Sequence, residues 1–158
     1  MNLRRTRSHP SGFTLVELVM VIAIAGILAV VALPRFANRS DSDLAGFGQG
    51  ARAALRFAQK TAIAQHRNVS VNLVSASGKI SVCFDSAYPC ATVVTDPASG
   101  AALSVVTPSG ISFTTSVAQL TFDWTGSPGG TAEALTISGG TGGATQTVSV
   151  DGSTGYVQ

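Results

Sequence analysis

The feature that most limits how this chain folds is an apolar run near its N-terminus. From Phe13 to Leu33, 21 successive residues are apolar or small except for Thr14 and Glu17. A helix of that length rises about 31 Å at ~1.5 Å per residue, close to the hydrocarbon thickness of a bilayer. The run therefore predicts a single membrane-spanning helix over residues 13–33.

The charges on either side of this run predict its orientation. Arg4, Arg5 and Arg7 precede the run, whereas Arg35 and Arg39 follow it. Because cytoplasmic flanks carry the excess of Lys and Arg, the N-terminus is expected in the cytoplasm. The rest of the chain is then expected outside the inner membrane.

Two residues bear on whether the run is an ordinary signal peptide. A signal peptide would be cut after small residues near residues 30–32 and removed. Glu17, however, is a carboxylate in an apolar segment, which costs about 2–3 kcal/mol unless a partner pairs with it, and this indicates a function. At the other end, Pro34 lacks an N–H and is expected to kink the helix.

The composition after the run favours an exported, β-rich domain. In the whole chain, only 11% of the residues are charged, and 17 are glycine. Without residues 1–12, the Lys and Arg count falls from 10 to 7 against 8 acids. The resulting net charge of −1 creates no positive field that would attract nucleic acid.

In an exported chain, the two cysteines, Cys83 and Cys90, favour a disulfide over two reduced thiols and do not suit a metal site.

A helical pattern resumes after the apolar run. One stripe of apolar residues, spaced three or four apart, predicts an amphipathic stem helix within residues 34–67 that lies on a sheet. Arg52, Arg56, Gln59 and Lys60 lie off this stripe and are expected to be solvated. The segment GFGQGA imitates a dinucleotide-binding motif but falls inside the helix, and DSDLAG imitates a calcium loop but lacks its ligands. The stripe consists of Leu44, Phe47, Ala51, Leu55, Ala58 and Ala62.

From residue 68 the period of the pattern changes to two. Turn-rich pieces such as DPASG, TGSPGG and SGGTGG separate the alternating runs. One helix followed by several antiparallel strands predicts an α+β fold, with residues 68–158 as its β-rich domain. The predicted strands lie at 68–74, 79–84, 103–106, 111–114, 120–124, 134–138, 146–150 and 155–158.

No pattern of catalytic residues in the sequence indicates an enzyme. His66 ends the stem helix and is interpreted as a helix-terminal cation. The sequence contains no G-x-S-x-G, H-E-x-x-H or phosphate-binding loop. Trp124 and Tyr156 are assigned to packing, and the aspartates at 85, 96, 123 and 151 to turns. We therefore predict that the chain is not an enzyme and that it uses no metal or cofactor.

The segment GFTLVE, followed by the apolar run, resembles the class III leader junction of type IV pilins and type II secretion pseudopilins. This resemblance implies that a prepilin peptidase removes the leader 1–12 by cutting between Gly12 and Phe13, and then methylates the Phe13 amine. Glu17 of one subunit would pair with the Phe13 amine of its neighbour in a filament, so that each charge satisfies the other. A pair within one chain is the alternative for Glu17.

The segments ARAALRFAQKTAIAQHRNVSV and LTFDWTGSPGG resemble GspH/FimT-type minor pilins and pseudopilins. The resemblance implies a pilin-like fold, a long N-terminal helix packed on antiparallel sheet. It also implies a structural subunit of a type IV pilus-like or type II secretion filament, whose partners are prepilin peptidase, the inner membrane and other pilins. A component of an MSHA-type pilus is a related alternative.

A DNA-binding minor pilin for natural transformation is the alternative function. Some FimT-like members end on a basic stretch, but here Gly155 is followed by YVQ, and the one basic cluster is that of the stem helix with Arg67. This departure argues against nucleic acid as a partner. The expected location is the bacterial inner membrane, with a periplasmic C-terminal domain, before assembly into a periplasmic or surface filament.

Overall fold

The computed structural model describes residues 13–37, 39–130, 132–140 and 142–158, with residues 31–37 and 39 described by their backbone alone. The expected leader and Gly12 lie outside these residues. The chain divides into two units, Met1–Ala37 and Asn38–Gln158.

The first unit consists of helix α1, Leu15–Ala37, which begins at a polar cap. The Glu17 N–H donates to the Thr14 hydroxyl at 3.2 Å, and the Leu18 N–H donates to the Thr14 carbonyl at 3.1 Å. These bonds satisfy two of the backbone donors that a helix leaves unpaired at its start. The helix continues through Pro34 to Ala37, and the kink at Pro34 stays a prediction.

The second unit begins with helix α2, Arg39–Gln65, which is the stem helix that the apolar stripe predicted. All six residues of that stripe are buried. The helix ends where His66 adopts a left-handed backbone with a φ of 48°, and there the Arg67 N–H donates to the Ala62 carbonyl at 3.2 Å. This left-handed residue satisfies late helix carbonyls in the way that a C-terminal glycine does elsewhere.

Four antiparallel strands form the first sheet, in the order β3-β2-β1-β5. The short helix η1, Ser75–Ser77, joins β1 to β2 and is followed by Gly78 at a φ of 60°. The strands are β1 Val69–Val74, β2 Lys79–Cys83, β3 Ser104–Val106 and β5 Gln119–Phe122.

Three antiparallel strands form the second sheet, in the order β4-β6-β7. The C-terminal segment returns along β7, where Val157 bridges Val150 and the main chains of Ser149 and Gln158 exchange two hydrogen bonds of 3.0 Å. The segment predicted as a strand at 155–158 therefore pairs through an isolated bridge only. The strands are β4 Ser112–Thr114, β6 Glu133–Ser138 and β7 Thr145–Val150.

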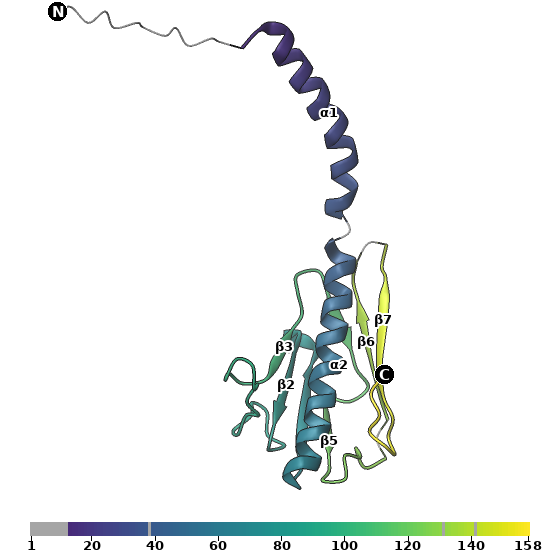
Figure 1. Ribbon diagram of the computed structural model, residues 1–158. Helices are drawn as coiled ribbons and strands as arrows, with labels where there is room; N and C mark the ends of the chain where they lie inside the picture. The colour runs from purple at the N-terminus through teal and green to yellow at the C-terminus, as the bar shows by residue number, and fades with distance from the viewer. Residues whose placement is uncertain (1–12, 38, 131, 141) are drawn as a thin grey trace, which may run out of the picture. The chain divides into compact units, whose positions relative to one another are not determined.

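A single apolar core lies between α2 and the two sheets. In Figure 1, α2 lies in front, with β2 and β3 on one side of it and β6 and β7 on the other. The Phe47 ring of α2 stacks on the Phe113 ring of β4 with centroids 5.8 Å apart, which joins the helix to the second sheet. Alternate residues of the strands point to this core, so the predicted α+β fold is confirmed.

Candidate functional site

The start of α1 combines exposed apolar side chains with one carboxylate. The side chains from Leu15 to Val30 are all exposed, and that of Phe13, just before the helix, is 82% exposed. Glu17 lies in the first turn among them. An apolar surface of this size needs lipid or other helices to cover it. Among the residues that the structure describes, no helix combines the length and the apolarity required to cross a membrane.

Glu17 also belongs to a capping arrangement that the sequence analysis missed. Thr14 and Glu17 have the spacing of a capping box, in which the first residue accepts from the third N–H and the acid reaches back to the first N–H. The structure has the first of these two bonds, from the Glu17 N–H to the Thr14 hydroxyl. The signal was present in the sequence as Thr-x-x-Glu before an apolar run.

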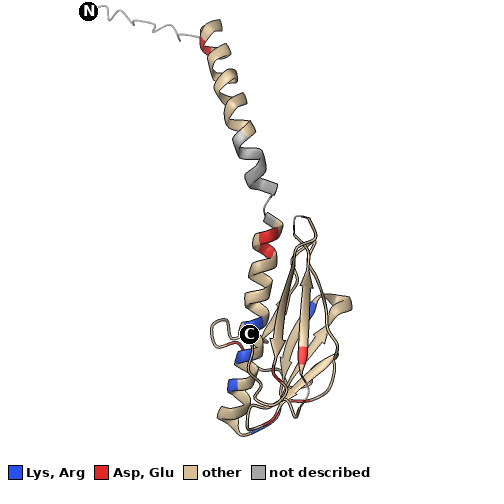
Figure 2. Ribbon diagram, turned by 90° about the vertical axis from the view of Figure 1, so that its right-hand side faces the viewer, with Lys and Arg blue, Asp and Glu red and all other residues tan. Residues whose placement is uncertain are grey.

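Two arginines of α2, Arg52 and Arg56, donate to main-chain carbonyls. Of the four residues expected to be solvated, Arg56 and Lys60 are exposed as predicted, whereas Arg52 and Gln59 are half-buried. Figure 2 shows basic residues along the second half of α2. Arg52 donates to the Thr147 carbonyl at 3.1 Å, and Arg56 donates twice to the Val157 carbonyl, at 3.3 and 2.9 Å. The stripe pattern places these side chains off the core, but the C-terminal segment folds back against them.

Gln59 extends the same contact by one turn of α2. Its side-chain amide donates to the Gly126 carbonyl at 3.0 Å and to the Thr154 carbonyl at 3.1 Å. Gly126 and Gly155 lie so close together that a Cβ on Gly155 would stand 2.0 Å from the Gly126 oxygen. The second half of α2 therefore holds two loops and the C-terminal segment in place.

The exposed aromatic residues lie on loops rather than in the core. Trp124 is 57% exposed and stacks on the His66 ring with centroids 6.1 Å apart, and Tyr156 is 61% exposed. Neither aromatic residue packs in the core, because Trp124 lies in the turn after β5 and Tyr156 lies next to the isolated bridge at Val157. His66 lies at the end of α2 as expected. Its neighbour Arg67 lies over the Phe84 ring, 4.2 Å from the centroid.

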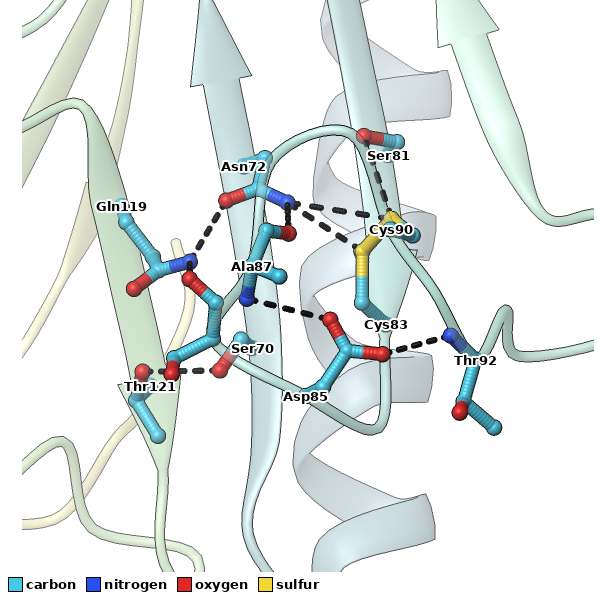
Figure 3. The surroundings of a disulfide bond; sticks show 11 residues. Ser70, Asn72, Ser81, Cys83, Asp85, Ala87, Cys90, Thr92, Gln119 and Thr121 are labelled. Carbon is cyan, nitrogen blue, oxygen red and sulfur yellow. Dashed lines mark hydrogen bonds between the residues drawn. A yellow bond between two sulfur atoms is a disulfide. The ribbon is translucent and has the colours of Figure 1, made fainter.

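Cys83 and Cys90 form the predicted disulfide on the face of the first sheet that points away from α2. Cys83 ends β2, and Cys90 lies in the loop that follows. Asn72, on the neighbouring strand β1, donates its side-chain amide to Cys83 Sγ at 3.2 Å and to the Ala87 carbonyl at 3.4 Å (Figure 3). Gln119 of β5 donates to Asn72 Oδ1 at 2.6 Å. Two side-chain amides and a disulfide thus hold the loop 84–92 on the sheet.

The four turn aspartates have their pKa held below the ordinary value by local hydrogen bonds. The Ser153 hydroxyl is the largest cause for the pKa of Asp151, followed by the Thr154 N–H. The other three carboxyl groups have their pKa lowered in the same way, with the main donor being the Thr92 N–H for Asp85, the Ala98 N–H for Asp96 and the Thr125 hydroxyl for Asp123. All four serve their own turns, as the sequence predicted.

Glu133, at the start of β6, is a buried acid that the sequence analysis did not single out. Its side chain is only 3% exposed. The carboxyl group accepts from the Ser116 N–H at 3.0 Å, from the Ser116 hydroxyl at 2.7 Å and from the Thr115 hydroxyl. These donors come from the loop between β4 and β5, so the group ties that loop to the second sheet.

Two solved structures of filament subunits have this fold. The type IV minor pilin FimU of Pseudomonas aeruginosa matches with a TM-score of 0.53 and 18% identity, over 75% of this chain and 88% of that one. The minor pseudopilin EpsH from the Type 2 Secretion System of Vibrio cholerae matches with a TM-score of 0.56 and 12% identity, over 73% and 94%. At these identities the likeness is one of fold, and the fold is that of minor pilins and pseudopilins.

The sequence comparisons place the chain within this class. The prokaryotic N-terminal methylation motif matches residues 7–33, and the type II transport protein GspH matches residues 49–154. The second match covers well over half of the chain, which therefore belongs to the GspH family, a family of structural pilins and pseudopilins that are anchored in the membrane and then assembled into filaments.

One relative from a sequence comparison supports this assignment. The type IV narrow pilus major component PilA5 of Thermus thermophilus is 40% identical over 58 residues, or 37% of this chain. The match covers 50% of PilA5, so the chain spans about half the length of that relative. Together with the family match, it is consistent with a pilin or pseudopilin.

Proposed function

We propose that a prepilin peptidase cuts this chain between Gly12 and Phe13 and that the mature subunit enters its filament through α1. The main support is the start of α1, where exposed apolar side chains surround one carboxylate, Glu17. The match of residues 7–33 to the N-terminal methylation motif supports the cleavage position. Residues 13–33 anchor the subunit in the inner membrane until it is assembled.

The chemistry of assembly follows from the new N-terminus. Cleavage turns the Phe13 nitrogen into an ammonium group, and N-methylation leaves its charge in place. Glu17 lies about one helical turn from this ammonium group. When subunits are staggered along a filament, Glu17 of one subunit reaches the Phe13 ammonium of the next. Each group alone is costly in an apolar medium, so the pair sets the stagger.

The contacts of α2 support a structural subunit over a nucleic-acid-binding one. DNA affinity requires free cationic side chains that displace counterions from phosphates. Here Arg52 and Arg56 donate to carbonyl groups of the same chain, and Arg67 covers the Phe84 ring. We therefore do not propose DNA binding.

The mass of the mature N-terminus in the native host tests this proposal. Chains purified from inner membranes are expected to begin at N-methylated Phe13. Gly12→Val, which adds bulk at the cleaved bond, is expected to leave the leader attached, and Ser11→Ala is the matched control. A wild-type chain that begins near Leu33, or that retains Met1, would exclude prepilin processing and the role of Glu17 that depends on it.

A further inference from the structure

The disulfide on the outer face of the first sheet is accessible from one side only. Cys83 is 0% exposed at the end of β2. Cys90 is half-buried and lines a hollow of about 180 Å³, which Lys79, Ser81 and Tyr88 also line. A reagent that enters this hollow meets Cys90, whereas Cys83 is buried and does not line the hollow.

The hydrogen bonds around the two sulfur atoms are also unequal. The Asn72 Nδ2 atom lies 3.2 Å from Cys83 Sγ but 3.7 Å from Cys90 Sγ, and the Ser81 hydroxyl oxygen lies 3.9 Å from Cys90 Sγ (Figure 3). The Asn72 side chain is 2% exposed, and its Oδ1 accepts from Gln119. The bond from Gln119 requires the Oδ1 atom of Asn72 to face β5. The Nδ2 group of Asn72 therefore faces the disulfide.

From these two asymmetries we propose that Cys83–Cys90 is a site of thiol–disulfide exchange in which Cys90 is attacked and Cys83 leaves. A thiolate enters the hollow and bonds to Cys90 Sγ while the Cys83–Cys90 bond breaks. The electron pair of that bond goes to Cys83 Sγ, which becomes a thiolate that accepts from Asn72 Nδ2. A second thiol then resolves the mixed disulfide, so that two partner thiols are oxidised and Cys83 and Cys90 are reduced.

Each asymmetry favours the same direction of exchange. Exchange rates depend on which sulfur is accessible and on how well the leaving sulfur bears negative charge. A hydrogen bond to an anionic acceptor is about twice as strong as one between neutral groups, so Asn72 assists the departure of Cys83. The ammonium group of Lys79 at the hollow attracts the incoming thiolate. The partner is therefore a thiol, carried by a small molecule or by a dithiol protein.

Exchange at this disulfide would attach a partner covalently to the surface of the domain, which filament assembly through α1 does not do. The partner becomes attached at Cys90, in a loop whose neighbours Ser86 to Pro89 are exposed. The loop also keeps anchors that do not involve sulfur, because Gln119 donates to the Ser86 carbonyl at 3.0 Å and Asn72 donates to Ala87. Exchange therefore modifies this face of the domain while the core between α2 and the sheets remains folded.

Mapping the mixed disulfide on the full chain in detergent tests the direction of attack. The folded protein is treated with reduced glutathione, quenched in acid and digested, and the glutathione adduct is located by mass spectrometry. A parallel arm uses a thioredoxin-like dithiol protein whose resolving cysteine is serine, which distinguishes a protein partner from a small one. We expect at least a tenfold excess of adduct on Cys90 over Cys83 in one or both arms. Equal labelling, labelling mainly on Cys83, or adducts that form only after denaturation would overturn the proposal.

A kinetic comparison tests the role of Asn72 by a separate readout. Asn72→Ala is expected to slow cleavage by glutathione about tenfold at constant pH. The matched control is Ser70→Ala, on the same strand and the same face, where the hydroxyl is hydrogen-bonded to the Thr121 hydroxyl at 3.0 Å. Lys79→Gln is expected to slow cleavage of the disulfide by glutathione but not cleavage by a neutral phosphine. If Asn72→Ala reacts as fast as the wild type, Asn72 does not assist the leaving group. The position of the glutathione adduct on the wild-type chain tests the direction of attack independently of these variants.

Discussion

Substitution can separate two roles of Glu17: its N–H donates to the Thr14 hydroxyl in the cap of α1, and, in our proposal, its carboxylate pairs with the next subunit. Glu17→Gln keeps a side chain suited to a capping box but removes the charge. We expect both this variant and Glu17→Ala to lower filament incorporation at least about tenfold, because an ammonium group left unpaired in an apolar medium costs about 3–5 kcal/mol. The sheared filament fraction, measured by immunoblot against the membrane fraction, gives the ratio.

Thr14→Ala is the matched control for Glu17. It weakens the cap of α1 by about 1 kcal/mol but leaves the charge of Glu17 unchanged. Filament incorporation is expected to stay near that of the wild type. If Glu17→Gln assembles normally while Thr14→Ala does not, the cap rather than the charge is what assembly requires.

Removal of the Glu133 side chain is expected to cause a large loss in the free energy of unfolding of the second unit. Glu133→Ala leaves the Ser116 N–H and the hydroxyls of Ser116 and Thr115 without their acceptor. Orphaned buried donors predict a loss of about 2–4 kcal/mol in the free energy of unfolding. Urea unfolding of the full chain in detergent, followed by Trp124 fluorescence, measures it. Glu133→Gln keeps an acceptor and should lose less; a change below about 0.5 kcal/mol for the alanine variant would refute this role.

At the scale of elements, the second half of α2 acts as a clamp for the C-terminal segment. Arg56→Ala removes both donors to the Val157 carbonyl. We expect a loss of about 1 kcal/mol, and amide exchange near Tyr156 to Gln158 that is faster by roughly five- to tenfold. Hydrogen exchange read by mass spectrometry tests the local effect. Lys60→Ala, one turn further along the exposed face, is the control, and equal exchange in the two variants would argue against the clamp.

Element types followed from the sequence because they depend on local periodicity. The stripe of α2 has the helical period and is buried as predicted, and each predicted run from β1 to β7 forms a strand within one or two residues of its expected ends. The contacts of Arg52, Arg56 and Gln59 did not follow. Their partners lie 67 to 101 residues further along the chain, and periodicity carries no information over that distance.

At the scale of the whole molecule, the four turn aspartates predict how stability depends on pH. Each has a lower pKa in the folded chain than its ordinary value of 3.8. The stability they contribute is therefore complete above that value and is lost as the pH falls towards their folded pKa values. We expect the unfolding temperature to be level down to about pH 5 and to fall between about pH 4 and pH 2.

Asp151→Asn tests that pH dependence, because Asp151 accepts from both Ser153 and Thr154 through one oxygen. The variant is expected to show a shallower fall in unfolding temperature below pH 4 and little change in slope at neutral pH. Calorimetry of both chains across that range provides the comparison. If the unfolding temperatures of the two chains fall equally below pH 4, Asp151 does not contribute to acid unfolding.

The sequence by itself determined the class of the protein, because the features that define it are local. The apolar run with Glu17, the class III junction and the change of period from helix to strand all lie within short windows, and they led to the pilin-like α+β fold. The disulfide was also within reach, since two cysteines separated by seven residues in an exported chain have few alternatives.

Only the tertiary structure decided what the side chains do once the strands come together. It placed Asn72 of β1 beside the sulfur of Cys83 and directed it with Gln119 of β5, 47 residues away. It also buried Glu133 under a loop and exposed Trp124. These outcomes depend on strand register and on how loops fold back across a sheet. Such arrangements are set by the packing of the whole core rather than by the residues adjacent in sequence.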